Sequence, residues 1–233
     1  MKNNKFSFEA EYFVFARKSR AVIMFLLLCV VCVANFFLAG VFWQLATLTG
    51  PLLSVAILCF MDYFVFAGFN SRKSQGMNLL KSSPRGRALV ESALKQDIVN
   101  KSVYTLAGSL FALFSVLKFN ESIDKPFVIA YAAGGFSTCL ILLRLVLLLN
   151  RAKGLTMQVH IFICYLCYSV GNCILLPMIF LSETGSLLIM IIYAVVAETG
   201  SILTGRWLII SCMKVYDSSF HDAEIEKNQE VSQ

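Results

Sequence analysis

The sequence predicts an all-α integral membrane protein, a polytopic fold with six transmembrane helices. Hydrophobic residues make up 58% of the 233 residues and charged residues only 15%. The mean hydropathy of +0.73 is too high for an ordinary water-soluble domain. The apolar residues also form continuous runs, whereas the strands of a membrane β-barrel alternate apolar and polar positions. These observations together favour membrane-spanning helices.

Six runs are apolar enough to be read as spans, because a helix needs about 20 mostly apolar residues to cross a bilayer core roughly 30 Å thick. They are Ala21 to Leu48, Leu52 to Phe69, Ser102 to Leu117, Phe127 to Leu149, Gln158 to Leu181 and Ser186 to Ser211. The first run is far longer than the apolar region of a signal peptide, so we expect it to be retained. The external connections are then short: Thr49-Gly50-Pro51, Lys118 to Pro126, and Ser182 to Gly185.

Lysine and arginine residues flank the predicted spans unevenly. Sixteen of the 20 lie on one side: Lys2, Lys5, Arg17, Lys18, Arg20, Arg72, Lys73, Lys81, Arg85, Arg87, Lys95, Lys101, Arg151, Lys153, Lys214 and Lys227. Only Lys118 and Lys125 lie on the other side. Because cationic flanks resist translocation, we expect the first side and both termini to be cytoplasmic, in a bacterial cytoplasmic membrane. Anionic lipid headgroups are a sufficient partner for the net charge of +6, and no nucleic acid is implied.

Three cytoplasmic segments hold most of the polar residues. Residues 1–20 place Phe8, Tyr12 and Phe15 at helical spacing, which is typical of an interfacial helix or of a simple juxtamembrane lead. The transmembrane domain, residues 21–216, contains a cytoplasmic loop at 70–101. The polar tail, residues 217–233, is predicted to be disordered.

The loop after the second span is predicted to be structured. A short apolar-faced helix is followed by Ser83-Pro84, a favourable helix start in which the serine caps and the proline takes the first position. Apolar residues then recur at helical spacing toward the third span: Leu89, Val90, Ala93, Leu94 and Ile98. A basic loop with an apolar stripe indicates docking to a cytoplasmic protein, and contact with lipid headgroups is the alternative.

The run from Gly76 to Val90, GMNLLKSSPRGRALV, resembles the loop between the second and third spans of type 2 ABC exporter permeases. In that family an apolar coupling helix precedes a Ser/Thr-Pro turn and a basic helix. The six spans, the cytoplasmic ends and the N-terminal helix are similar too. Two features depart from the family. The acidic residue often found in the coupling segment is replaced by Asn78 or is absent. The family often has a re-entrant hairpin before the last span, and the short link from Ser182 to Gly185 leaves little room for one.

The resemblance implies a permease half that pairs with itself or with a sibling, while two ABC ATPase subunits dock on the coupling helices. By position, the coupling contact would be Met77, Asn78, Leu79, Leu80 and Lys81, and the elbow helix would carry Phe8, Tyr12, Phe13 and Phe15. The chain has no GxxxxGK[ST] phosphate loop, so it is expected to be no enzyme and to hold no cofactor. ATP and magnesium would be bound by the partner ATPase.

Four charged residues fall within the predicted spans, where a charge costs roughly 3 to more than 10 kcal/mol and needs a partner, water or a function. Asp62 lies near the middle of the second span and Glu198 near the middle of the sixth. Arg144 and Arg206 lie closer to the cytoplasmic ends, where they can pair or snorkel. The acids could line a path for a cationic substrate, pair with an arginine, couple protons, or orient helices through hydrogen bonds.

The cysteines are Cys29, Cys32, Cys59, Cys139, Cys164, Cys167, Cys173 and Cys212, all within or at the end of spans, which implies no disulfide framework. The Cys164/Cys167 spacing favours packing over a metal site. The leading function is an ATP-driven exporter of an amphipathic or hydrophobic substrate, preferably a short peptide. The alternatives are a proton-coupled secondary carrier using Asp62 and Glu198, the substrate-binding component of a vitamin uptake system, or a membrane-embedded enzyme or sensor scaffold.

Overall fold

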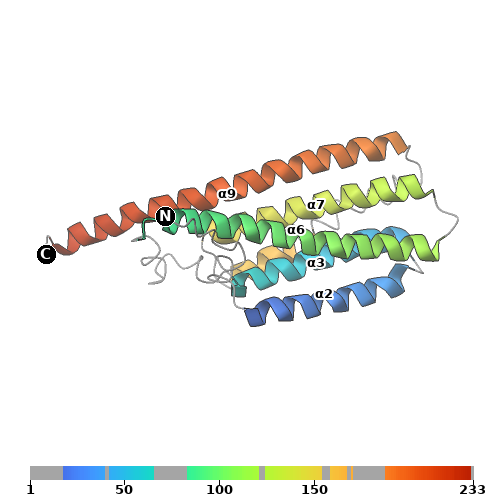
Figure 1. Ribbon diagram of the computed structural model, residues 1–233, viewed down its shortest axis with the longest axis horizontal. Helices are drawn as coiled ribbons and strands as arrows, with labels where there is room; N and C mark the ends of the chain where they lie inside the picture. Colours follow the sequence, from blue (N-terminus) through green and yellow to red (C-terminus); the bar gives the residue numbers. More distant parts are fainter. Residues whose placement is uncertain are drawn as a thin grey trace, which may run out of the picture.

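The structure is a computed structural model that describes residues 18–39, 42–65, 83–120, 124–153, 158–166, 169 and 187–231. The described chain is all helical, as predicted (Figure 1). Its helices are α2 (Lys18–Ala39), α3 (Trp43–Val65), α6 (Gly86–Phe119), α7 (Lys125–Lys153) and α9 (Leu187–Val231). Residues 158–166 are helical as well.

The helices lie side by side along one long axis, with α9 and α2 at the two edges and α7, α6 and α3 between them (Figure 1). α3 packs against α2, α6 and α7, while α9 packs mainly against α7. α2 and α6 run in one direction and α3, α7 and α9 in the other (Figure 1). α9 therefore begins at the end of the bundle opposite to the end of α7. Helical residues 158–166 lie in the intervening chain, and the His160 Nε2 atom is 2.8 Å from the Cys59 carbonyl oxygen of α3.

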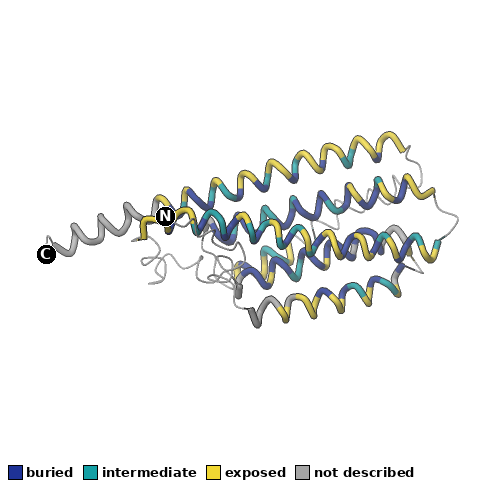
Figure 2. The backbone as a smooth tube through the Cα atoms, in the orientation of Figure 1, coloured by how far each residue is buried: buried dark blue, intermediate teal, exposed yellow. Residues whose placement is uncertain are grey.

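Among the described residues, three helices are long and apolar enough to cross a membrane: Gly86–Phe119, Lys125–Arg151 and Leu187–Asp217. Shorter apolar helices span Phe25–Phe37 in α2 and Ala46–Asp62 in α3. Exposed positions run along α2, α6 and α9 (Figure 2). Many of them hold large apolar side chains, among them Phe25, Val30, Leu110, Phe114, Leu188 and Val196. Such a surface is stable in lipid rather than in water.

The sequence prediction is wrong at the first external connection. Thr49-Gly50-Pro51 lies inside α3, because α2 already ends at Ala39 and α3 begins at Trp43. The residues at 40–42 are Gly, Val and Phe, so hydropathy detects no polar break between the two helices. A proline inside a membrane helix is tolerated where neighbouring helices surround it, and Pro51 is buried.

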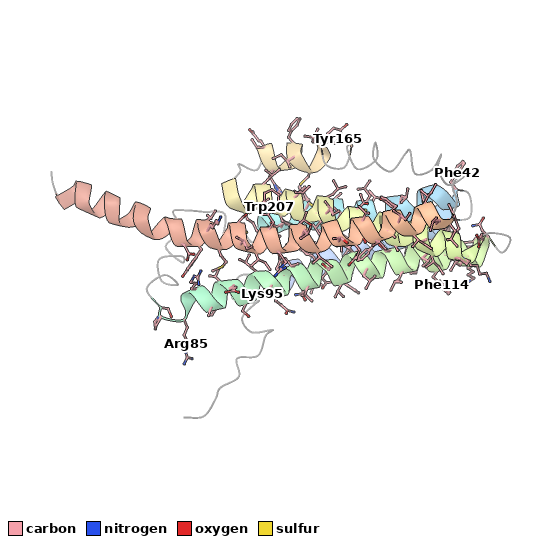
Figure 3. All side chains as sticks on the ribbon, turned by 90° about the horizontal axis from the view of Figure 1, so that it is seen from above. Phe42, Arg85, Lys95, Phe114, Tyr165 and Trp207 are labelled. Carbon is pink, nitrogen blue, oxygen red and sulfur yellow. The ribbon has the colours of Figure 1, made fainter. Side chains whose placement is uncertain are left out.

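The predicted third span and the preceding amphipathic helix form one helix, α6, of 34 residues. At its start the Arg85 amide is 3.4 Å from Ser83 Oγ, and the Gly86 amide donates to the Ser83 carbonyl at 2.9 Å. The predicted cap is therefore wrong, because the helix begins at Gly86 with Arg85 as its N-cap and no side chain caps it; Ser83 instead accepts within the turn that precedes the helix. Arg85 and Phe114, labelled in Figure 3, lie toward the two ends of this helix.

The last helix, α9, also differs from the prediction, because it continues to Val231 through the segment expected to be a disordered tail. The segment contains Glu224, Glu226, Lys227 and Glu230, all of good helix propensity, so it can extend the helix that precedes it. Near the bundle, the Arg87 side chain of α6 binds both carboxylate oxygens of Asp217 at 3.1 Å. This pair joins α9 to the start of α6.

Glycines allow α7 to approach its neighbours closely. A Cβ atom at Gly134 would lie 2.2 Å from the Tyr193 ring of α9, and one at Gly135 would lie 2.7 Å from Leu48 of α3. The Tyr193 hydroxyl also hydrogen-bonds with Thr138 Oγ1 of α7. Small residues at helix contacts are a general device of membrane proteins.

Candidate functional site: a buried ionic cluster

Four charged side chains meet where α3, α6 and α7 pack together. Asp62 comes from α3, Asp97 and Lys101 from α6, and Arg151 from α7. Each is at most 3% exposed, and Arg151 is among the largest fully buried side chains of the described residues. We call these four residues the ionic cluster. It lies at the end of the bundle where α3 ends and α6 begins.

Each acid of the ionic cluster contacts both cations. Lys101 Nζ lies 2.5 Å from Asp62 Oδ1 and 2.7 Å from Asp97 Oδ2. Arg151 Nη2 lies 2.6 Å from Asp62 Oδ1 and also pairs with Asp97 Oδ2. The second Asp62 oxygen accepts from Asn150 Nδ2 at 3.1 Å and from Arg151 Nε at 3.4 Å. Both carboxylate oxygens of Asp62 therefore have donors.

The charges of the ionic cluster balance, with two carboxylates against an ammonium and a guanidinium. Burying charges costs free energy that good pairing roughly offsets, so such a cluster adds little net stability. Removing one member is different, because an uncompensated buried charge remains. The ionic cluster therefore holds three helices in one particular arrangement.

The surface around the ionic cluster changes from charged to apolar. On α6, Arg87 and Lys95 are exposed, whereas from Val99 to Phe114 the exposed side chains are apolar, including Val103 and Leu110. From Val99 to Lys118 the helix rises about 28 Å at 1.5 Å per residue, close to the thickness of a bilayer core. The ionic cluster thus lies at the edge of the apolar band that is nearer to the start of α6.

This position corrects the sequence prediction for Asp62. The residue was expected near the middle of a span and paired, if at all, with Arg144 or Arg206. It lies instead close to the end of α3 at Val65, and its partners are Lys101 and Arg151. The difference arises because α3 begins at Trp43, so the whole span is shifted toward the N-terminus.

Sequence reasoning missed most of the ionic cluster. Lys101 and Arg151 were counted among the cytoplasmic flanking cations, and Asp97 was not singled out. A signal was present, because Asp97 and Lys101 continue the buried helical stripe of Val90, Ala93 and Leu94. A charged i, i+4 pair on the buried face of an amphipathic helix needs partners on another helix.

Glu198 and Arg144 both lie at the α7–α9 contact but bind different partners. Ser137 Oγ of α7 donates to Glu198 Oε2 at 2.6 Å. The Arg144 guanidinium donates to Ser201 Oγ at 2.7 Å, to the Ser201 carbonyl, and to Ser102 Oγ at 3.3 Å. Arg144 is thus hydrogen-bonded between helices. Glu198 is exposed and hydrogen-bonded to a serine.

The remaining predicted residues are not brought to this site. Arg206 is exposed on α9. The predicted coupling contact, Met77, Asn78, Leu79, Leu80 and Lys81, and the predicted elbow residues Phe8, Tyr12, Phe13 and Phe15 lie outside the described residues. The ends of α3 and α6 that flank the coupling segment are described, and both reach the ionic cluster.

No protein-family model, curated protein or solved structure matches the chain.

Proposed function

We propose that this chain is the membrane subunit of an ATP-driven exporter of the type 2 ABC class, which moves an amphipathic or hydrophobic substrate, preferably a peptide, outward. It would cross the membrane six times, with an interfacial N-terminal helix and both ends inside, and would act as a dimer of permease protomers. One observation carries the proposal. The ionic cluster fastens together the two helices, α3 and α6, whose ends flank the predicted coupling segment.

A coupling segment is useful only if its movement reaches the transmembrane helices. α6 is unbroken from Gly86 to Phe119, a rise of about 50 Å at 1.5 Å per residue. The ionic cluster links this helix to α3 and α7, and the Arg87–Asp217 pair links it to α9. A displacement of the segment by a docked ATPase would therefore move several helices together.

The arrangement of the helices supports six passes. The start of α9 lies at the end of the bundle opposite to the end of α7 (Figure 1). A further pass between them would bring the chain back to that end. Helical residues 158–166 belong to this intervening stretch and contact α3 through His160. α2 and α3 supply shorter apolar helices in the same bundle.

The exporter fits the ionic cluster better than a proton-coupled carrier does. Both oxygens of Asp62 accept from cationic or amide donors in a balanced set of charges. Loss of the Asp62 charge would leave two buried cations with incomplete partners. A carrier would need an acid that gains and loses a proton in every cycle, and Asp62 is poorly suited to that role.

Co-purification tests the proposal. The chain is expressed together with the genes that neighbour its own, and the complex is purified from native membranes through a tag on the chain. We expect an ATPase to be retained and to be lost in the double variant Leu79→Glu/Leu80→Glu. Ala88→Glu, an exposed position on α6 outside the coupling contact, is the matched control and should retain it. A complex without any ATPase, or full retention by the double variant, would refute the exporter.

A further inference from the structure

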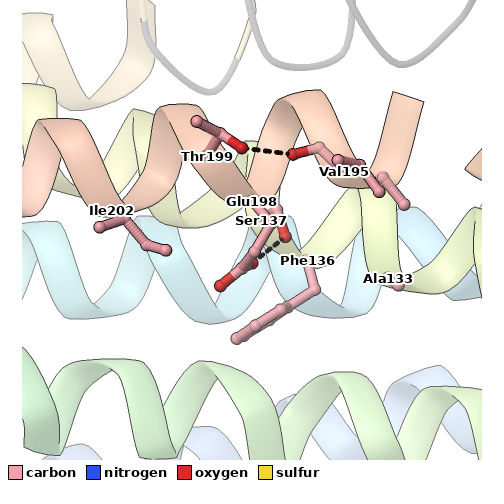
Figure 4. Close-up of a pocket in the computed structure, with 8 residues that line it drawn as sticks. Ala133, Phe136, Ser137, Val195, Glu198, Thr199 and Ile202 are labelled. Carbon is pink, nitrogen blue, oxygen red and sulfur yellow. Dashed lines mark hydrogen bonds between the residues drawn. The ribbon is translucent and has the colours of Figure 1, made fainter. Parts of the chain in front are cut away.

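The α7–α9 contact holds a pocket at the middle of the apolar band. The pocket has a volume of about 380 Å³, within the range of roughly 300–1,000 Å³ that is usual for small-molecule sites. Its apolar walls include Ala133, Phe136 and Ile202, and its polar groups are Ser137, Glu198 and Thr199 (Figure 4). Most of these residues are exposed, so the pocket opens to the outer surface of the helices.

The pocket lies deep in the bilayer when the apolar band is placed in the membrane. Glu198 follows the start of α9 at Leu187 by about 16 Å of helix rise, and Ser137 follows the start of α7 at Lys125 by about 18 Å. Both distances are close to half the thickness of a hydrocarbon core. A molecule could therefore reach Glu198 from the lipid phase.

No cationic side chain among the described residues pairs with the Glu198 carboxylate. Its hydrogen bond is with the neutral Ser137 hydroxyl, and no salt bridge involves it among the described residues. Thr199 directs its hydroxyl to the Val195 carbonyl instead (Figure 4). Arg144 is near enough to interact electrostatically, but its guanidinium donates to Ser201 and Ser102. An exposed acid at this depth favours a cationic partner.

A second copy of the chain is a poor candidate for that partner. Rotation about a two-fold axis along the membrane normal keeps every residue at its own depth, so Glu198 would face another Glu198. Arg206, the exposed cation of α9 nearest to Glu198 along the helix, lies eight residues further on, about 12 Å away in depth. The charges of such a dimer would be mismatched.

We propose that this pocket binds the cationic headgroup of an amphipathic molecule that enters from the lipid phase, with the Glu198 carboxylate as its counter-ion and the apolar walls against its hydrocarbon part. The inference rests on the proposed function only in making this molecule the transported substrate. It narrows the substrate class from amphipathic to cationic and amphipathic.

Binding to the purified full-length chain in neutral-lipid nanodiscs tests the site without any ATPase. The probe is a fluorescent alkyl trimethylammonium, whose charge does not depend on pH, and the matched probe is the fluorescent alcohol of equal chain length. We expect Glu198→Gln to weaken binding of the ammonium probe by about tenfold or more and to leave the alcohol probe within about twofold. Helical circular dichroism and a monodisperse elution profile verify that the variant is folded.

Two further variants separate the acid from its surroundings. Ser137→Ala removes the hydrogen bond but keeps the carboxylate, so the ammonium probe should bind at least as tightly as to the unaltered chain. Ala133→Trp fills the pocket wall and should weaken binding of both probes.

The proposal is overturned if Glu198→Gln weakens binding of both probes equally or of neither. It is also overturned if Ala194→Cys chains cross-link to each other in membranes, because a second copy of the chain would then cover the pocket. Loss of ATPase co-purification would refute the exporter and leave this binding result unaffected.

Discussion

At the residue scale, two lysines of α6 make the same contact in opposite surroundings. Lys95 lies 2.6 Å from Glu91, four residues earlier, with 51% of its side chain exposed, while Lys101 lies 2.7 Å from Asp97 with 4% exposed. We expect Lys101→Met to lower the unfolding free energy by about 3–5 kcal/mol, because two buried carboxylates then share one guanidinium. Lys95→Met should cost at most about 1 kcal/mol. Denaturant titration in mixed micelles measures both, and equal losses would contradict the buried cluster.

A double variant tests whether charge balance is the cause. Asp97→Asn with Lys101→Met leaves Asp62 and Arg151, which still pair at 2.6 Å. We therefore expect the double variant to be more stable than Lys101→Met alone, although it carries one more substitution. The same titration gives the coupling free energy. If the two losses simply add, Asp97 and Lys101 act independently and balance is not the cause.

Individual residues of the candidate site were predictable to different degrees. A hydropathy reading could identify Asp62 as an acid that needs a partner, because it lies within an apolar run. It could not identify the partners, because pairing between α3, α6 and α7 depends on how these helices dock. Lys101 and Arg151 resemble ordinary flanking cations until the structure places them inside the bundle. Glu198 was predicted as an intramembrane acid, and its pocket required the neighbouring helix.

At the scale of the elements, the α7–α9 contact depends on Gly134. A Cβ atom there would lie 2.2 Å from the Tyr193 ring, whereas one at Gly200 would meet only the end of the flexible Ile141 side chain at 3.1 Å. We expect Gly134→Ala to destabilise the chain by about 1–3 kcal/mol through overpacking. Gly200→Ala, on the facing helix, is the control and should cost less than about 1 kcal/mol. An equal or smaller loss for Gly134→Ala in thermal or denaturant unfolding would show that α7 and α9 are not closely packed.

Helices were easier to predict than their ends. The apolar runs identify the helical class, and Ser83 identifies the start of α6 to within three residues. The connection between α2 and α3 was not predicted because residues 40–42 are apolar apart from a glycine. Pro51 was wrongly read as part of a loop, because a proline usually interrupts a helix, whereas this one lies inside α3. Where hydropathy has no contrast, the turn is set by the packing of α2 against α3.

At the scale of the whole molecule, the exposed cations predict an orientation that reporter fusions can test. Arg85, Arg87 and Lys95 are exposed at the end of the bundle where α6 begins, and Lys118 and Lys125 at the other end. Since cationic flanks stay inside, alkaline phosphatase fused after Asn120 should be active and phosphatase fused after Gln233 inactive. A fluorescent protein that matures only in the cytoplasm should give the opposite pattern at the same two positions. Phosphatase activity at Gln233 would place the ionic cluster at the outer membrane face, where no cytoplasmic ATPase could act on it, and would refute the exporter together with its orientation.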